Sequence, residues 1–145
     1  MILFLDIDGV LHPLFPRRDR PAAESMPLAY LPRLASVLRE HPHVQVVISS
    51  TWRISRSLEQ LQQLFPHDLQ HRVIGATPAL NEDARHGGRE WEALSWLDAH
   101  PQHTEWLALD DCAPCWSSLW KVVLCEDGFR DTEEVALREI LSITS

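Results

Sequence analysis

The stretch MILFLDIDGVLH at residues 1–12 decides the fold. Residues 1–5 form a short, unbroken apolar run, which is typical of a strand buried on both faces of a parallel sheet. The run ends abruptly at Asp6-Ile7-Asp8-Gly9. Because strand side chains alternate in direction, Asp6 and Asp8 leave the strand end on the same side, and Gly9 permits a tight turn. Two carboxylates at the end of a buried strand predict a cation site.

Further apolar runs alternate with segments of helical periodicity along the rest of the chain. Strands are expected at residues 44–48, 72–74, 105–109 and 121–125. Helices are expected at residues 28–40, 55–65, 89–99 and 131–143. This alternation predicts one domain over residues 1–145, a Rossmann-like three-layer α/β/α sandwich with a mainly parallel sheet of about five strands.

Two of the expected helices carry more detailed predictions. The helix at residues 89–99 is expected to bury an apolar face made of Trp91 or Leu94, together with Trp96 and Leu97. The last helix is expected to begin with a capping box, because Glu134 follows Asp131 by three residues.

Composition and charge exclude several classes of protein. The chain of 145 residues is 45% hydrophobic and 23% charged, which is ordinary for a globular domain and excludes disordered and fibrous classes. The formal net charge of −8 argues against broad electrostatic binding to nucleic acid, although Arg17, Arg18 and Arg20 form a local basic cluster. The apolar opening is too short for a signal peptide or a membrane span, which predicts a cytoplasmic protein without a membrane partner.

The three cysteines are an odd number in a chain expected to be intracellular, so a disulfide framework is not expected. Cys112 and Cys115 have the spacing of redox or metal-binding pairs. No second pair of this kind accompanies them. We therefore interpret them as small buried residues beside a strand.

Polar residues follow two further strands where each strand ends. Ser49-Ser50-Thr51-Trp52-Arg53 follows the strand at residues 44–48, and Asp110-Asp111 follows the strand at 105–109. In an open α/β sheet, ligands bind outside the carboxyl ends of the strands. A lone Asp-X-Asp is ordinarily a turn or a helix cap, but the second acidic pair favours a functional site. Two loops border this edge: a proline-rich segment at residues 13–27, expected to form a wall of the site, and residues 75–88, expected to be mobile.

These motifs resemble those of the haloacid dehalogenase (HAD) superfamily of phosphatases. Within that superfamily, the chain resembles the HAD domain of Swiss Army Knife RNA repair proteins. The matching stretches are FLDIDGVLHP for the first motif, VVISSTWR for the second, Arg89 for the third and LALDD for the fourth. Arg89 departs from the commonest pattern, in which a lysine fills the third position. The resemblance implies a HAD-like fold, and the short loops imply that it has no large cap domain.

The resemblance also implies a role for each motif residue. Asp6 is the expected nucleophile that forms an aspartyl-phosphate, and Asp8 is the expected general acid and base. The expected ligands of Mg²⁺ are Asp6, Asp8 through its backbone carbonyl, Asp110 and Asp111. The expected phosphate- or substrate-binding residues are Ser49, Ser50, Arg53 and Arg89. Ser50 is an alternative to Ser49, while Arg53, Arg72 and Arg85 are alternatives to Arg89.

The function implied is a Mg²⁺-dependent phosphohydrolase. An open site suits a phosphate on a large or extended partner, and together with the resemblance to RNA repair domains it implies a nucleic acid end or a nucleotide phosphate as the substrate. The acidic net charge argues against this substrate. The alternatives are a small-metabolite phosphatase and a non-catalytic HAD-like binding module. Trp52 is expected either to pack against a substrate ring or to hold Arg53. His12 is a candidate site residue with an equally good structural interpretation.

Overall fold

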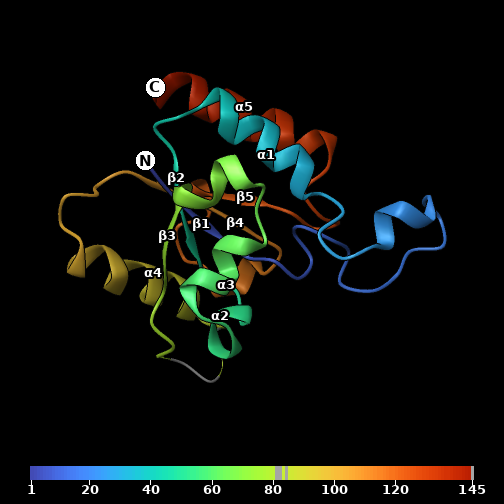
Figure 1. The fold of residues 1–145 in the computed structure, drawn as a ribbon. Coiled ribbons are helices and arrows are strands. Elements are labelled where there is room, and N and C mark those ends of the chain that lie inside the picture. Colours follow the sequence, from blue (N-terminus) through green and yellow to red (C-terminus); the bar gives the residue numbers. More distant parts are fainter. Residues whose placement is uncertain (81–82, 84, 145) are drawn as a thin grey trace.

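A parallel sheet forms the centre of the computed structural model, which describes residues 1–80, 83 and 85–144 (Figure 1). The strands of this described part are β1 (Ile2–Leu5), β2 (Gln45–Ile48), β3 (Val73–Ala76), β4 (Trp106–Asp110) and β5 (Val122–Leu124). Their order in the sheet is β3-β2-β1-β4-β5, and every pairing is parallel. The first strand of the chain is therefore the central strand, and the predicted sheet is confirmed.

Helices cover both faces of the sheet. Figure 1 shows α1 (Leu31–Glu40) and α5 (Asp131–Thr144) side by side on one face, with α4 (Gly88–Ala99) on the other. Short 3-10 turns join these elements: η1 (Ala22–Ser25), η2 (His67–Arg72), η3 (Ala113–Cys115) and η4 (Leu119–Lys121). This arrangement confirms a HAD-like α/β/α fold, and the described residues form no cap domain. In the described residues, no helix is both long and apolar enough to cross a membrane.

Alternation along β1 places the site residues on one face of the sheet. Leu3 and Leu5 belong to the core beneath α1 and α5, whereas Ile2 and Phe4 belong to the smaller core beneath α4. Continuing this alternation turns Asp6 toward the side of α4. In β4, Ala108 belongs to the same smaller core, so Asp110 also turns to that side.

The helix expected at residues 55–65 is two helices, α2 (Trp52–Ser55) and α3 (Leu58–Gln63). The break falls at Ser57, whose hydroxyl accepts a hydrogen bond from the Gln60 amide while the Gln60 side chain accepts one from the Ser57 amide. This reciprocal capping box starts a new helix, because it satisfies backbone donors that have no partner within the first turn.

The buried face of α4 differs from the predicted one. Trp96 and Ala93 are buried, but Trp91 is 55% exposed and Leu94 is 42% exposed. Glu90 and Glu92 are buried in their place. Periodicity predicted this face only partly, because both glutamates are buried against partners elsewhere in the chain. Glu90 accepts a hydrogen bond from the Ser118 amide, and Glu92 pairs with Arg53.

The capping contact of α5 lies one residue earlier than predicted. The amide of Arg130 donates to Oε1 of Glu133 at 3.0 Å. Asp131 and Glu134 instead bind the guanidinium of Arg33 on α1, at 2.5 and 3.0 Å. The two acidic residues therefore tie α5 to α1 rather than cap their own helix.

The interpretation of Cys112 and Cys115 as unpaired residues is wrong, because a disulfide joins them. The 3-10 turn η3 after β4 brings their Cα atoms to 5.5 Å, which is within the range that a disulfide spans. Cys125 is a free, buried thiol, and burial raises its pKa above the ordinary value. The CxxC spacing thus marks a local bridge directly after the fourth motif.

The limits of the two predicted loops differ from those expected. Residues 13–27 contain the turn η1 and lie beyond the carboxyl end of β1. In the segment at residues 75–88, β3 extends to Ala76 and α4 begins at Gly88. The prediction of mobility falls partly on residues 81, 82 and 84, which lie outside the described residues.

Candidate active site

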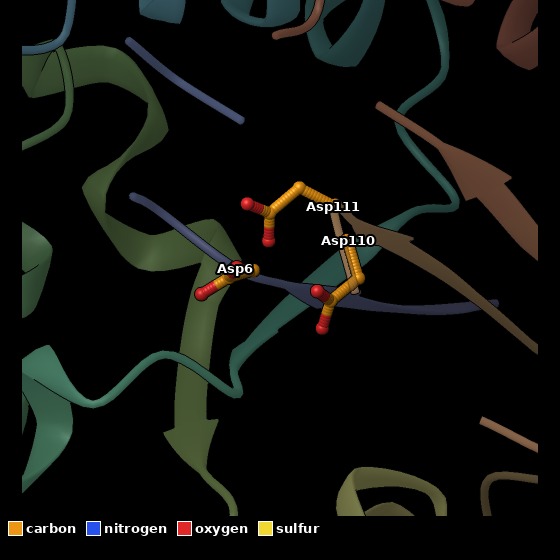
Figure 2. A group of neighbouring side chains, drawn as sticks. All are labelled: Asp6, Asp110 and Asp111. Carbon is orange, nitrogen blue, oxygen red and sulfur yellow. The ribbon is translucent and has the colours of Figure 1, made fainter. Parts of the chain in front are cut away.

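Three carboxylates meet at the carboxyl ends of the two central strands. Asp6 follows β1, Asp110 ends β4, and Asp111 comes next (Figure 2). Leu5 pairs with Leu109 in the parallel register, so the residues that follow these two lie side by side. One oxygen of each carboxylate lies within 4.8 Å of the others. We call Asp6, Asp110 and Asp111 the carboxylate group.

Gly9 makes room for Asp111. Its φ of +80° is a left-handed conformation that glycine adopts easily. A Cβ atom at this position would lie 2.2 Å from Oδ2 of Asp111. The glycine of the first motif is therefore required both by the turn and by the close approach of the fourth motif.

The carboxylate group carries more negative charge than its surroundings balance. Burial raises the pKa of Asp6 well above its usual range; Asp110 raises it further, and Arg89 opposes the shift. Burial likewise raises the pKa of Asp110, again opposed by Arg89. Within the carboxylate group, Arg89 contacts two members: its Nη1 lies 3.4 Å from Asp6 Oδ1, and its Nε lies 3.8 Å from Asp110 Oδ2. A single guanidinium thus faces three carboxylates.

An all-oxygen donor set with excess negative charge fits a hard divalent cation such as Mg²⁺. The orientation of Asp110 is already set, because the Cys112 amide donates to its Oδ1 at 2.9 Å and the Trp116 indole donates to its Oδ2 at 3.1 Å. The donor chemistry and this fixed geometry both suit a metal site.

Two buried polar atoms beside the carboxylate group have no hydrogen-bond partner within the described part of the chain. They are Oγ of Ser49 and Nε of Arg89. The guanidinium of Arg89 is held by its Nη1, which donates to the backbone carbonyl of Ser49. Burying a donor without a partner costs free energy, so such atoms indicate an external ligand. A phosphate oxygen would satisfy both.

The other predicted phosphate ligands have different partners. The hydroxyl of Ser50 accepts a hydrogen bond from the Trp52 amide at 3.2 Å. Arg53 pairs with Glu92 at 3.1 Å and donates to four backbone carbonyls. These carbonyls belong to Ser49, Ser50, Thr77 and Pro78. Both residues therefore hold the scaffold of the second motif.

Of the four arginines considered for the third motif, Arg89 is the one that contacts Asp6. Arg72 donates to the carbonyls of His41 and Val44. Arg85 is exposed and pairs with Asp83. Arg89 reaches the site because it lies in the first turn of α4, whose N-terminus approaches the ends of β1 and β4.

The side chain of Asp8 lies outside the carboxylate group. Its Oδ1 is 2.8 Å from Nε2 of His12, and its Oδ2 accepts a hydrogen bond from the Trp52 indole at 3.0 Å. A metal contact through the Asp8 backbone carbonyl stays a prediction. Trp52 was expected to pack against a substrate ring or to hold Arg53, but its indole binds the carboxyl group of Asp8 instead. Its indole could have been suspected from its place beside the second motif, but the sequence does not show which acceptor it meets.

A small cavity of about 170 Å³ opens next to Asp111 and Gly9. Leu14 and Phe15 line it from the proline-rich segment, and Phe15 is 73% exposed. The segment thus borders the site. Glu126 and Asp127 form the opposite wall, which sequence reasoning missed.

The basic cluster predicted beside this cavity is largely neutralised. Arg17 and Arg20 both bind Asp127. Arg17 also pairs with Asp19 at 3.0 Å. Two of the three clustered arginines are therefore occupied by carboxylates and offer little attraction to a polyanion.

Comparison with known families identifies this arrangement. A family model described as the HAD domain in Swiss Army Knife RNA repair proteins matches residues 2–133. The matched range includes every strand and the whole carboxylate group. No curated protein and no solved structure matches the chain. The chain belongs to the family of HAD domains found in Swiss Army Knife RNA repair proteins.

Proposed function

We propose that the chain is a Mg²⁺-dependent phosphohydrolase that acts through an aspartyl-phosphate on Asp6. The observation that carries this proposal is the carboxylate group beside two buried donors that have no hydrogen-bond partner among the described residues, Ser49 Oγ and Arg89 Nε. Carboxylates bind the cation, and the donors bind phosphate oxygens. Membership of the HAD family supports phosphohydrolase chemistry.

In the proposed reaction, a carboxylate oxygen of Asp6 attacks phosphorus, and the bond from phosphorus to the leaving oxygen breaks. Asp8 gives its proton to that leaving oxygen. Asp8 then takes a proton from water, whose oxygen attacks phosphorus and releases Asp6 and inorganic phosphate. Arg89 and Ser49 bind the equatorial oxygens of the phosphoryl group, where charge is spread.

The residues that would hold the metal are Asp6, Asp110 and Asp111. Bound Mg²⁺ would supply positive charge that offsets the repulsion between the carboxylate group and the phosphate. Without it, one guanidinium faces three carboxylates and a phosphate dianion. Activity is therefore expected to require a divalent cation.

The proposed substrate is a phosphate at a nucleic acid end or on a nucleotide. The short loops leave the site open, and the side chain of Asp8 is 43% exposed. The exposed ring of Phe15 beside the cavity offers a stacking surface for a terminal base. Since Arg17 and Arg20 are occupied by Asp127, we propose that recognition is confined to the terminal nucleotide. The cytoplasmic location stays a prediction.

A small-metabolite phosphatase is the second candidate. The net charge of −8 and the cavity of about 170 Å³ favour it, because both suit a small substrate better than a long polyanion. A non-catalytic binding module is disfavoured, because Asp6 and Asp8 are both present.

The test is phosphate release from p-nitrophenyl phosphate, mononucleotides and oligonucleotides phosphorylated at the 3′ or 5′ end. Mg²⁺ is expected to support turnover, and excess chelator to stop it. Asp6→Asn is expected to lose at least about 10³-fold in kcat, because the amide is not a nucleophile. Asp98→Asn, an exposed position on α4, is the matched control and should retain activity.

The pattern of turnover separates the candidates. Preference for oligonucleotide ends supports the nucleic acid end, whereas turnover of mononucleotides alone supports the metabolite phosphatase. Turnover that persists in Asp6→Asn removes Asp6 from its role. Absence of turnover over the whole panel would favour the binding module.

A further inference from the structure

We propose that His12 and Trp52 are positioning residues that hold the carboxyl group of Asp8 in its working orientation. The inference rests on the proposed function, in which Asp8 protonates the leaving oxygen. Neither residue contacts the carboxylate group in the described structure, and both reach the reaction through Asp8.

The two contacts bind different oxygens of the same carboxyl group. Nε1 of Trp52 donates to Oδ2 at 3.0 Å, and Nε2 of His12 lies 2.8 Å from Oδ1. One contact alone would leave the carboxyl group free to rotate about it. Two contacts on opposite oxygens fix both its position and its plane, and each oxygen keeps a further site for a proton or a substrate atom.

A backbone amide determines which nitrogen of His12 carries the proton. The amide of Leu28 points at Nδ1 of His12, at 3.0 Å. An amide can only donate, so Nδ1 is the acceptor and Nε2 carries the hydrogen. His12 therefore donates to Asp8 as a neutral ring, and the contact needs no change in its charge.

Asp8 needs this support because of where it lies. Asp6 sits at the end of the central strand and is buried, whereas Asp8 belongs to the turn after it and its side chain is 43% exposed. An exposed carboxylate exchanges among rotamers, and ordering it carries an entropic cost. The contacts with His12 and Trp52 order the Asp8 side chain before substrate binds, so this entropic cost does not arise during the reaction.

Both supporting side chains are themselves held. The side chain of His12 is 13% exposed, and its ring centroid lies 5.9 Å from that of Trp52. The guanidinium of Arg56 lies 4.1 Å from the centroid of the Trp52 ring. One residue of the first motif and one residue of the second motif thus converge on one carboxyl group.

Substrates with different leaving groups can show whether His12 and Trp52 position Asp8 for proton transfer or only pack against it. An alkoxide leaves poorly and needs a proton, whereas p-nitrophenolate leaves with little help. The quantity to compare is kcat/KM, because it covers the steps up to departure of the leaving group. Misplacing Asp8 should therefore lower kcat/KM much more for an alkyl phosphate than for p-nitrophenyl phosphate.

The experiment measures both substrates with the full chain and Mg²⁺. The variants are Trp52→Phe, which removes the donor but keeps an aromatic ring, and His12→Leu; His12→Gln keeps a donor of similar reach. Trp120→Phe, at a position 79% exposed, is the matched control. We expect Trp52→Phe and His12→Leu to lose about 10- to 100-fold on the best nucleoside phosphate and less than about 3-fold on p-nitrophenyl phosphate. His12→Gln should recover part of the loss.

Several results would overturn the inference. Equal losses on both substrates would mean that the residues only support packing, and unchanged kinetics would mean that Asp8 does not need them. Thermal unfolding of each variant identifies any that fail to fold, and Trp52→Phe and His12→Gln are the variants that perturb volume least. A wild-type chain without turnover overturns the proposed function together with the inference, so the two failures are distinguishable.

Discussion

Two sets of buried charges lie close together in this protein and differ in how they are balanced. The Arg53–Glu92 pair is complete: the two side chains meet at 3.1 Å, and the remaining donors of Arg53 bind backbone carbonyls. The carboxylate group is incomplete: among the described residues, Arg89 is the cation that forms ion pairs with it, and Nε of that arginine has no hydrogen-bond partner there.

This difference separates structural charges from functional ones. Arg53 joins the segments after β2 and β3 to α4, so its charge is used entirely within the fold. Burial, with a smaller contribution from neighbouring carboxylates, raises the pKa of Asp6 and of Asp110, so their charged forms are disfavoured in the fold alone. A buried site that is unbalanced in the free protein is suited to bind a charged ligand.

The largest expected effect comes from breaking the complete pair. Arg53→Ala should lower the free energy of unfolding by about 3–5 kcal/mol, because Glu92 would be left buried without its partner. Urea denaturation followed by circular dichroism measures this change. Arg39→Ala, which breaks the exposed pair with Asp68, is the control and should have little effect. Similar losses in both variants would contradict the comparison.

A smaller effect, of opposite sign, is expected at the carboxylate group. In the metal-free chain, Asp6→Asn should raise the free energy of unfolding at pH 8 by about 1–2 kcal/mol, because it removes a buried charge beside Asp110. The same variant is the one expected to lose turnover. Denaturation in excess chelator measures the change. A variant less stable than the wild type would show that the charge of Asp6 does not destabilise the metal-free fold.

The pH dependence of the metal-free wild type follows from the same shift. The pKa of Asp6 is about 3.9 in the unfolded chain and is raised in the folded chain. At a pH between these two pKa values, the folded chain binds more protons than the unfolded chain. The free energy of unfolding should therefore fall as pH rises through that window. Asp6→Asn should reduce the pH dependence of the free energy of unfolding. The contribution of Asp110, whose pKa is also raised, should remain.

The smallest expected effects compare two adjacent serines. Ser50→Ala should lower the free energy of unfolding by about 1 kcal/mol, because the Trp52 amide loses its acceptor. Ser49→Ala should change it by less than about 0.5 kcal/mol, because its hydroxyl has no hydrogen-bond partner in the described structure. Conversely, Ser49→Ala should lower kcat/KM by about 10- to 100-fold if this hydroxyl binds the phosphoryl group. Denaturation and steady-state kinetics on both variants test these predictions. An unchanged kcat/KM in Ser49→Ala would mean that the Ser49 hydroxyl does not bind the phosphoryl group and that Arg89 does so without it.

Local pattern was enough to predict the strands, their parallel arrangement and the edge where the site lies. The apolar runs before Asp6, Ser49 and Asp110 end within a residue or two of the observed strands. The polar residues that follow three of the expected strands also predicted that side chains from separate motifs gather at one edge, where the carboxyl ends of parallel strands meet. These features depend on neighbours in the sequence, so periodicity reports them directly.

Tertiary structure decided which polar atoms find partners. In the sequence, Arg53 was an alternative to Arg89 for the third motif, yet Arg53 is occupied by carbonyls and Arg89 contacts Asp6. The buried face of α4 and the contacts of Trp52 were likewise set by residues tens of positions away. The reason is physical: hydrophobic periodicity records which side of an element is apolar, whereas a hydrogen bond depends on where packing places two atoms within about 3 Å of each other.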